Sequence, residues 1–447
     1  MGSNPIPSAI SFPSHLMFMD TFYIWTIGCQ MNLADSERLA TALEQLGLHS
    51  VGKAVDADVI VLNSCVVRQS AEDKVTGALG MMRPLKKERP DRVLALMGCM
   101  VGPKSADLEA RFPYVDVFMR PQQYTPLLDL LGQRLGLDWE GCVGSLAPTK
   151  PSVSCYIPII HGCDLMCSFC IIPYRRGRQV SRPLDEVASE VELLVRRGVK
   201  EVTVLGQTVD AYGYDLPDKP DLADLLVRLN DISGLARIRF LTSHPSFMSE
   251  RIIRAVAELP KVCEHINLPV QAGDDQVLAQ MRRPYTQAEY RRLIDQIRGA
   301  IPGVSLSTDI IVGFPGETEE QYGRSLELVS DLRFDKVHCA AYSPRPGTVA
   351  FRTMNDEIPR EEKLRRLKAL DQLQESILRE KNAALVGQDV EILVESYNKG
   401  KWQGRTRTDK LVFFQDDGDR LGELVKAEIT SASPWSLQGV PAGSSTI

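Results

Sequence analysis

The chain has 447 residues, 44% of them hydrophobic and 25% charged, with a formal net charge of −6. This length predicts two or three domains, and the composition excludes a disordered protein. No apolar run approaches the roughly 20 residues of a membrane span, and the acidic balance means that any RNA contact must come from local basic patches.

The N-terminal third of the chain alternates short apolar runs with helical patterns. Residues 1–20 contain Pro5, Pro7 and Pro13 and lack the regions of a secretory signal, so they predict a disordered leader and a cytoplasmic protein. Residues 21–143 then form one predicted domain. Its strand candidates are Phe22–Ile27, Asp58–Leu62 and Arg92–Met97, and its first helix is predicted over Ser36–Leu46. Strands separated by helices predict an open parallel α/β sheet.

A Pro- and Ser-containing linker at residues 144–152 separates this domain from the next. Residues 153–382 repeat the strand–helix rhythm, and two of the helices begin at capping boxes, Thr286 with Glu289 and Thr318 with Gln321. The strand candidates are Cys155–Ile160, Glu201–Leu205, Arg237–Leu241, Glu264–Leu268, Ser307–Val312 and Lys336–Ala341. These units predict an incomplete (β/α)6 barrel, with its chemistry just beyond the strand ends.

The C-terminal part begins after a charged helix predicted over Glu361–Asn382. Residues 383–447 hold short β runs at Asp389–Glu395, Lys410–Phe414 and Glu423–Ile429, separated by glycine turns. This pattern predicts a small β-barrel of the oligonucleotide-binding (OB-like) kind.

Three cysteines follow the first strand of the middle domain within eight residues. The run is His161-Gly-Cys163-Asp-Leu-Met-Cys167-Ser-Phe-Cys170. Three thiolates this close can bind three irons of a four-iron cluster and leave one iron open to a small ligand. The alternative is structural zinc, which needs four ligands; no second cysteine pair follows, and His161 remains a possible fourth.

Cys29, Cys65 and Cys99 form a second set, because each follows a predicted strand within three residues. The carboxyl ends of parallel strands form one crevice, so three distant thiols would meet there and could hold a second metal site. The alternative is that they are buried small hydrophobic residues, which is also the expectation for the remaining cysteines. Those are Cys142, Cys155, Cys263 and Cys339.

Basic residues gather in two places. Arg175, Arg176, Arg178 and Arg182 follow the cysteine loop and could hold RNA phosphates or a carboxylate; a solvated charge run is the alternative. In the C-terminal part, basic residues alternate with aromatic ones, which fits RNA backbone contact with base stacking. The predicted RNA-binding residues there are Lys399, Lys401, Trp402, Arg405, Arg407 and Lys410.

Together these motifs resemble the methylthiotransferase family of radical S-adenosylmethionine enzymes, in particular the MiaB-type branch that modifies tRNA. The resemblance extends from Phe22 to Gly439. The matching blocks are the CxxxCxxC run, Gly28–Asn32, Asn63–Arg68, Gly98–Met100, and Gly404–Phe414 with Ala432–Leu437, which look like the TRAM RNA-binding domain. Gln30-Met31-Asn32 favours the tRNA branch, whereas Val66-Val67 and Thr208-Val209-Asp210 depart mildly from its pattern.

This resemblance implies a radical methylthiotransferase that acts on C2 of N6-isopentenyladenosine at tRNA position 37. It implies two 4Fe-4S clusters, one on Cys163, Cys167 and Cys170 and an auxiliary one on Cys29, Cys65 and Cys99, and two S-adenosylmethionine molecules. The partners would be tRNA, a reductant such as flavodoxin or ferredoxin, and a sulfur donor, and we expect a monomer without membrane contact. Three alternatives remain open: a methylthiotransferase for a ribosomal protein side chain, one for threonylcarbamoyl adenosine, and an RNA-binding module with structural metal.

Strand-end placement, together with family position, identifies candidate contacts of S-adenosylmethionine. For each residue, scaffolding at the barrel rim is the alternative. The candidates are Phe169, Gly206, Gln207, Ser243, His244, Asn267, Gln271, Gly313, Phe314 and Tyr342.

Overall fold

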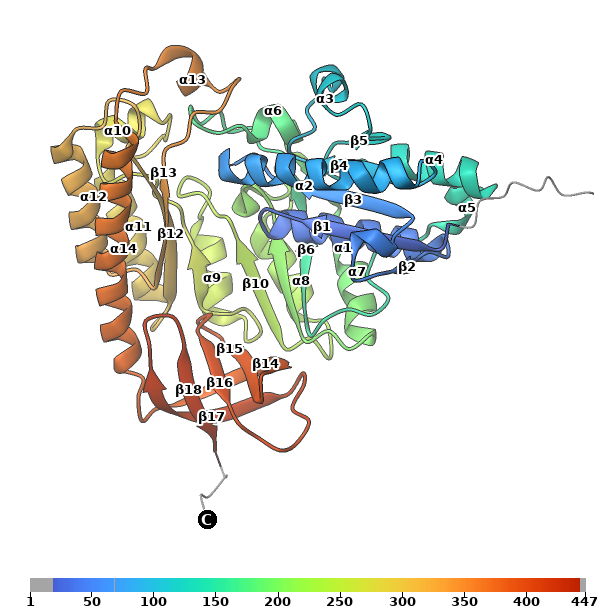
Figure 1. The fold of residues 1–447 in the computed structure, drawn as a ribbon. Coiled ribbons are helices and arrows are strands. Elements are labelled where there is room, and N and C mark those ends of the chain that lie inside the picture. Colours follow the sequence, from blue (N-terminus) through green and yellow to red (C-terminus); the bar gives the residue numbers. More distant parts are fainter. Residues whose placement is uncertain (1–18, 68, 443–447) are drawn as a thin grey trace, which may run out of the picture.

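The computed structural model describes residues 19–67 and 69–442, so most of the predicted leader lies outside the described residues. Figure 1 shows three parts: an α/β layer structure near the N-terminus, a larger barrel-like part in the middle, and a small β-barrel at the C-terminal end. Among the described helices, none combines the length and apolar character that a membrane span requires.

The N-terminal part is built on a parallel sheet with the strand order β2-β1-β3-β4-β5. Its strands are β1 (Thr21–Thr26), β2 (His49–Ser50), β3 (Val59–Ser64), β4 (Val93–Gly98) and β5 (Val117–Met119). The three predicted strands are confirmed, whereas the short edge strands β2 and β5 were not predicted. β3 and β4 are buried along their whole length because helices cover both faces of the sheet, as parallel sheets require.

Five helices pack on this sheet: α1 (Gln30–Gln45), α2 (Gln69–Glu88), α3 (Ala106–Arg111), α4 (Thr125–Leu135) and α5 (Trp139–Cys142). The predicted start of the first helix at Ser36 is wrong, because α1 begins directly after Cys29. Its first turns carry Asn32 and Asp35, which are buried although they are polar. Their burial depends on hydrogen bonds to distant residues, so hydrophobic periodicity did not reveal this part of the helix.

The middle part contains six parallel strands in two three-stranded sheets, β10-β9-β6 and β11-β12-β13. The backbone N–H of Ser243 donates to the carbonyl of Asn267 (3.2 Å), which joins the two sheets into one curved wall. The strands are β6 (Ser154–Pro158), β9 (Glu201–Leu205), β10 (Arg237–Leu241), β11 (His265–Asn267), β12 (Ser305–Val312) and β13 (Lys336–Ala341). Within the described residues β6 and β13 do not pair, so the predicted incomplete barrel is confirmed.

A short antiparallel pair, β7 (Ile160–His161) with β8 (Val180–Ser181), flanks the cysteine loop. Both predicted capping boxes are present, on Thr286 and Thr318. The helices of the middle part are α6 (Ile172–Arg176), α7 (Leu184–Arg196), α8 (Leu222–Asn230), α9 (Glu250–Glu258), α10 (Asp275–Gln280), α11 (Gln287–Ala300), α12 (Glu319–Leu332), α13 (Val349–Thr353) and α14 (Arg360–Ala383).

The C-terminal part is a closed barrel with the order β14-β15-β16-β18-β17, as predicted for an OB-like domain. Its strands are β14 (Asp389–Asn398), β15 (Lys401–Thr406), β16 (Leu411–Phe414), β17 (Leu424–Ala432) and β18 (Leu437–Pro441). The small barrel lies at the amino-terminal ends of the strands of the large barrel, and α14 leads into it along the outside (Figure 1).

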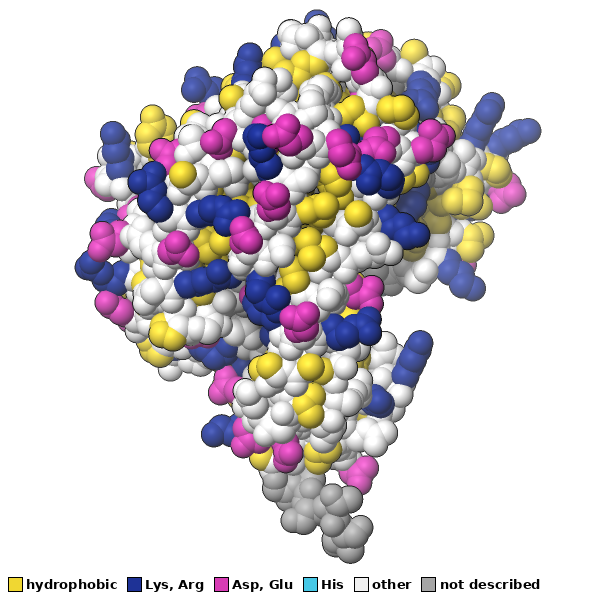
Figure 2. Space-filling view, turned by 90° about the vertical axis from the view of Figure 1, so that its left-hand side faces the viewer, with side chains coloured by type: hydrophobic (Ala, Val, Ile, Leu, Met, Phe, Trp, Pro, Cys, Tyr) yellow, Lys and Arg dark blue, Asp and Glu magenta, His cyan; other side chains and the backbone are white. Residues whose placement is uncertain are grey.

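Buried arginines hold the two barrels together. On β10, Arg237 donates to the carbonyl of Arg405 (2.6 Å) and Arg239 to that of Arg407 (2.8 Å). On the outer side of the large barrel, where α12 lies, basic and acidic side chains alternate without forming a continuous positive surface (Figure 2).

Candidate active site

Cys29, Cys65 and Cys99 come from the ends of three neighbouring strands, β1, β3 and β4. Two glycines make the turns that lead to the first and last of them. Gly28 has φ +143° and Gly98 has φ +102°, and a Cβ atom at either position would collide with Asn32 and Cys65 or with Ser64 and Asn63. Glycine is therefore required to bring these cysteines to one edge of the sheet.

A buried amide network, which sequence reasoning missed, supports this edge. The Asn32 side chain donates to the side-chain oxygen of Asn63 and to the carbonyl of Ser64, both at 2.9 Å. The Cys29 thiol lies 3.4 Å from the Asn32 side-chain oxygen. An asparagine near the cysteine in each of the first two blocks was the available sequence signal, but only the fold shows that the two meet.

The thiols of Cys65 and Cys99 are buried, whereas Cys29 is exposed. The pKa of Cys65 is raised to about 11, chiefly by burial and also by the neighbouring Cys99 and Cys29. Burial likewise raises the pKa of Cys99. The three thiols thus converge on one site and influence one another, and a metal bound there would have to displace their protons.

The second triad lies on the loop between β7 and α6. The Cys163 sulfur is 3.4 Å from both the Thr208 hydroxyl and the Leu165 backbone nitrogen. Burial raises the pKa of Cys170 to about 12. The backbone N–H groups and hydroxyl around these sulfurs are the kind of hydrogen-bond donors that stabilise thiolates bound to iron.

Arg283 is a further residue at this triad that sequence reasoning missed. Its side chain is 8% exposed, and one guanidinium nitrogen lies 3.5 Å from the Cys167 sulfur. The same guanidinium donates to the Tyr285 hydroxyl (2.7 Å) and to the carbonyl of Pro269 (2.8 Å). Arg283 therefore ties the cysteine loop to the segment that carries Pro269 and Tyr285.

The spacing within the two triads differs from that of a single-ion site. Among the described residues, no three Cys, His, Asp or Glu side chains are grouped closely enough to hold one metal ion. The ligands of a four-iron cluster each bind a different iron, so they need not share an ion. Three thiolate donors suit a four-iron cluster with one iron left open, whereas structural zinc takes four ligands around one ion.

The candidate contacts of S-adenosylmethionine fall into three groups. Phe169, Gln271 and Tyr342 line a largely apolar cavity of about 230 Å³ beside Cys170. In the described part of the chain, the Gln207 side-chain oxygen, the Ser243 hydroxyl and Nε2 of His244 are buried without a hydrogen-bond partner. Buried polar atoms normally have hydrogen-bond partners, so we expect a bound polar ligand to supply the partners of these three atoms.

The third group lines or supports the barrel interior. Asn267 donates to Asp309 (3.3 Å) and lines the larger cavity described below, and Gly206 leaves no space for a Cβ atom against Ile160. Phe314 is fully buried and packs edge-on against Tyr342 with ring centroids 5.3 Å apart. Phe314 therefore supports Tyr342 from behind.

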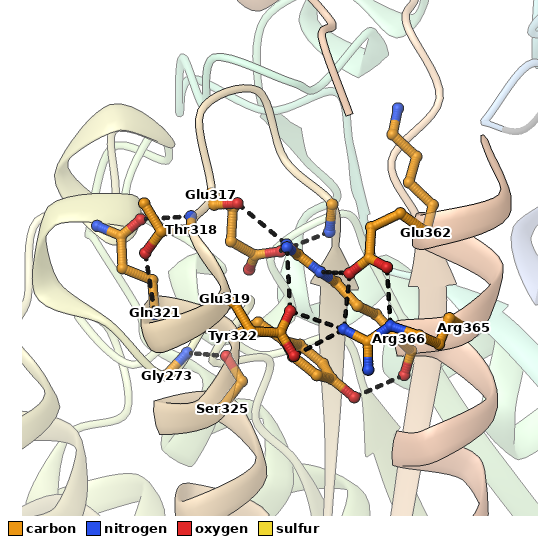
Figure 3. A network of polar contacts seen from close by, with 12 residues as sticks. Gly273, Glu317, Thr318, Glu319, Gln321, Tyr322, Ser325, Glu362, Arg365 and Arg366 are labelled. Carbon is orange, nitrogen blue, oxygen red and sulfur yellow. Dashed lines mark hydrogen bonds and ion pairs between the residues drawn. The ribbon is translucent and has the colours of Figure 1, made fainter. Parts of the chain in front are cut away.

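Gly313 belongs to a loop that α14 holds in place. Its backbone N–H donates to the carboxylate of Glu317 (2.6 Å), which also accepts a bond from Arg366 (2.9 Å). Figure 3 shows how this buried pair joins the loop to α12 and α14. The Lys363 side chain fills the space where a Cβ atom of Gly313 would lie.

A cavity of about 600 Å³ joins the three parts of the molecule. Cys29 and Cys65 line it from the N-terminal part, Asn267 and Asp309 from the large barrel, and Asp409 from the small barrel. The auxiliary triad and the barrel interior therefore open into the same space.

The four arginines that follow the cysteine loop point in different directions. Arg176 is buried against Asp35, with 3.1 Å between Nη2 and Oδ2, and Arg182 is paired with Glu186 and Glu190. The Arg175 guanidinium packs against Gly102, where an added Cβ atom would collide with it. Arg178 has a side chain that is 90% exposed. Of the four, Arg178 is the most accessible to a phosphate group.

The basic residues of the small barrel also differ in their exposure and in their partners. Lys399 is exposed, and Lys401 donates to Gln438 (3.0 Å). Arg405 pairs with Asp409 within the small barrel. Arg407 pairs with Glu264 and Lys410 with Asp335, so these two lie toward the large barrel. Trp402 is buried under the exposed ring of Tyr397, 4.8 Å away.

Three known families match successive parts of the chain. Residues 157–329 match the Radical SAM superfamily, residues 21–120 match the uncharacterized protein family UPF0004, and residues 383–442 match the TRAM domain. A radical S-adenosylmethionine methyltransferase, TsrM from Kitasatospora setae, has a similar fold with a TM-score of 0.55 and 14% identity, covering 75% of this chain and 77% of that one. Fold and site thus define a radical S-adenosylmethionine enzyme, a class that uses S-adenosylmethionine and a 4Fe-4S cluster.

Two curated relatives indicate which family of radical S-adenosylmethionine enzymes the chain belongs to. A tRNA-2-methylthio-N(6)-dimethylallyladenosine synthase from Herpetosiphon aurantiacus is 49% identical over 427 residues, which cover 95% of this chain and 98% of the relative. Another, from a Roseiflexus species, is 51% identical over 95% of this chain and 90% of its own length. The chain belongs to the MiaB-type family of tRNA-2-methylthio-N(6)-dimethylallyladenosine synthases.

Proposed function

We propose that this chain is a tRNA methylthiotransferase that replaces the hydrogen at C2 of N6-isopentenyladenosine, also called N6-dimethylallyladenosine, at tRNA position 37 with a methylthio group. One observation carries this proposal: Cys29 and Cys65 line the same cavity as the barrel residues Asn267 and Asp309. A group held on the auxiliary triad would thus be presented to a substrate that enters the barrel. The curated names of the relatives describe the same reaction product.

We propose two 4Fe-4S clusters, one on each cysteine triad. When bound, the clusters and S-adenosylmethionine would supply the radical chemistry and the sulfur-containing group that an unactivated aromatic C–H bond requires. The residues of the chain would bind and orient these groups and shield them from solvent. Arg283 and Thr208 would hold the sulfurs of one triad, and Asn32 would order the other.

The buried polar atoms of Gln207, Ser243 and His244 support a polar ligand at the strand ends, and we assign them to the amino acid portion of S-adenosylmethionine. The apolar cavity beside Phe169 and Tyr342 would take its adenosine portion. The pKa of His244 is lowered to about 3, chiefly by burial and also by Arg283, so His244 is neutral. Its Nδ1 accepts from the backbone N–H of Ser246 (3.2 Å), so Nε2 carries the proton and would donate to the carboxylate group.

The target adenine would reach the cavity by flipping out of the anticodon loop, because a stacked base cannot enter a barrel. The small barrel contributes Asp409 to the cavity wall and exposes Tyr397 and Lys399. We propose that these two residues contact tRNA by stacking and by charge. A tRNA substrate would place the enzyme in the cytoplasm, where flavodoxin or ferredoxin could reduce it and a separate donor supply sulfur.

The test is anaerobic incubation of the reconstituted protein with isopentenylated tRNA, S-adenosylmethionine, reductant and sulfide, followed by mass spectrometry of the digested nucleosides. We expect a gain of methylthio mass on isopentenyladenosine. Parallel reactions with tRNA carrying threonylcarbamoyl adenosine and with ribosomal protein test the two sibling activities. Modification of either one instead of isopentenyladenosine would overturn the proposal, and so would zinc content without cleavage of S-adenosylmethionine.

A further inference from the structure

Arg176 reaches from the radical S-adenosylmethionine part into the N-terminal part of the molecule. It is the last residue of α6, which directly follows the Cys163–Cys170 loop. Its side chain is 2% exposed and pairs with Asp35 on α1, whose side chain is 1% exposed. Helix α1 begins immediately after Cys29, so this ion pair links the segments that carry the two cysteine triads.

The positive charge of Arg176 also acts electrostatically on the thiols of Cys99 and Cys29, and it lowers the pKa of Cys99 against the larger effect of burial. The Nε atom of Arg176 is buried and has no partner in the described part of the chain. Burial lowers the pKa of Arg176, but the charges of Cys99 and Asp35 outweigh burial and raise it. The side chain therefore carries a full positive charge beside the auxiliary triad.

Once the thiols are ionised, the positive charge of Arg176 has negatively charged neighbours in addition to Asp35. Three thiolates around a cluster leave an anionic site, and a buried anion needs a compensating charge. The burial of Arg176 excludes contact with tRNA phosphate, although its place in the sequence suggests a basic patch. A planar guanidinium with several donors can serve a carboxylate and a sulfur at once, which a lysine ammonium does less well.

We propose that Arg176 is a positioning residue of the auxiliary cluster, which compensates its negative charge and orients it toward the cavity shared with the barrel. The inference rests on the proposed function, because it requires a cluster on Cys29, Cys65 and Cys99. Reduction makes a cluster more negative, so a buried positive charge beside it favours the reduced form.

The test uses the full-length chain with Cys163, Cys167 and Cys170 replaced by alanine, so that iron is held by the auxiliary triad alone. Iron and sulfide content and an electron paramagnetic resonance redox titration are measured for this protein and for variants in its background. R176Q removes the charge and R176K keeps it. R178Q is an exposed control on the same loop, and R38Q breaks a different ion pair between the two parts, that of Arg38 with Glu190 (2.8 Å).

We expect R176Q to lower the reduced-to-oxidised ratio at a fixed potential about tenfold, which corresponds to about 59 mV for one electron. R176K should retain most of the reduced-to-oxidised ratio of the parent protein, and R178Q and R38Q should retain all of it. D35N removes a negative charge from the same pair and should shift the ratio in the opposite direction. D35N also keeps the test decisive if R176Q fails to assemble a cluster.

An R176Q protein that holds iron and titrates like its parent would overturn the role of Arg176 and leave the proposed function intact. The same shift in R38Q, or shifts of equal sign in R176Q and D35N, would also overturn it, because they indicate a general loss of domain contact. Absence of iron from the parent would remove the auxiliary cluster, and both proposals with it.

Discussion

Asp210 shows how strongly burial controls a single residue near the site. Its side chain is 5% exposed, and its carboxylate oxygens accept bonds from the backbone N–H of His244 at 2.8 and 3.0 Å. Burial raises the pKa of Asp210 from 3.8 to about 8, although these bonds oppose the increase. At neutral pH the folded protein therefore keeps Asp210 largely protonated.

Removing this ionisable group should change how stability depends on pH. As pH rises from about 4 to about 8, an unfolded Asp210 loses its proton while the folded one keeps it, so folding stability falls by at most about 1.4 kcal/mol per pH unit. The D210N variant should lose less thermal stability than wild type between pH 6 and pH 8. Thermal unfolding without S-adenosylmethionine measures this difference, with the exposed Asp231→Asn as control. Equal pH dependence of D210N and wild type would contradict the prediction.

Substitutions in the two cysteine triads should affect different activities of the enzyme. Alanine at Cys29, Cys65 or Cys99 should abolish methylthiolation and leave reductive cleavage of S-adenosylmethionine largely intact, because that cleavage would need only the other triad. Alanine at Cys170 should abolish both activities. Chromatography of 5′-deoxyadenosine and nucleoside analysis measure the two products. The exposed Cys142, replaced by alanine, serves as control. Loss of both activities in the Cys99→Ala variant would show that the sites are not separable.

At the scale of elements, α14 supports the loop that carries Gly313. Arg366 on α14 is buried and donates to the carbonyl (3.0 Å) and the carboxylate (2.9 Å) of Glu317. The carboxylate in turn accepts from the Gly313 N–H, so one ion pair sets the loop conformation (Figure 3).

Breaking this pair should be costly because it leaves Glu317 buried without its partner. We expect R366A to reduce stability by about 3–5 kcal/mol and to weaken binding of S-adenosylmethionine. Denaturant unfolding and equilibrium dialysis measure the two effects. The neighbouring Arg365 is a matched control, since its half-exposed side chain pairs with Glu319 and Glu362 on the surface. An R365A variant that destabilises as much as R366A would contradict this explanation.

At the scale of the whole molecule, some basic residues of the small barrel that were predicted to bind RNA instead contact the large barrel. Arg407 pairs with Glu264 (2.7 Å) and donates to the carbonyls of Pro260 and Val262. Lys399 lies away from this interface and is exposed. The two residues should therefore have different roles.

We expect R407A to reduce stability by about 1–3 kcal/mol by weakening the contact between the barrels. K399A should leave thermal stability unchanged, weaken tRNA binding severalfold, and reduce the salt dependence of binding by about one counterion. Thermal unfolding and tRNA binding at several salt concentrations measure these effects. If K399A destabilises the fold and R407A affects tRNA binding alone, the assignment is reversed.

The strand–helix rhythm and the capping boxes predicted the fold class from sequence, because these signals are local or repeat along the chain. Cysteine spacing indicated one triad, and the predicted strand ends indicated the other. The early start of α1 was not predictable, since buried Asn32 and Asp35 depend on partners that only folding supplies. The same reason applies to Arg283, whose role depends on its distance from Cys167.

The direction in which a charged side chain points was also decided by tertiary structure. In sequence, Arg176 and Arg178 belong to one basic run, and Lys399 and Arg407 to another. In the fold, Arg176 and Arg407 are held by acidic partners on other parts of the molecule. Lys399 is exposed, and Arg178 is also exposed although it pairs with the nearby Asp164 (3.3 Å). A charge pattern records which groups are present, but burial and pairing depend on segments that are distant in sequence. By itself, the sequence therefore indicated which cysteines belong together, and the tertiary structure decided which charged side chains lie beside them.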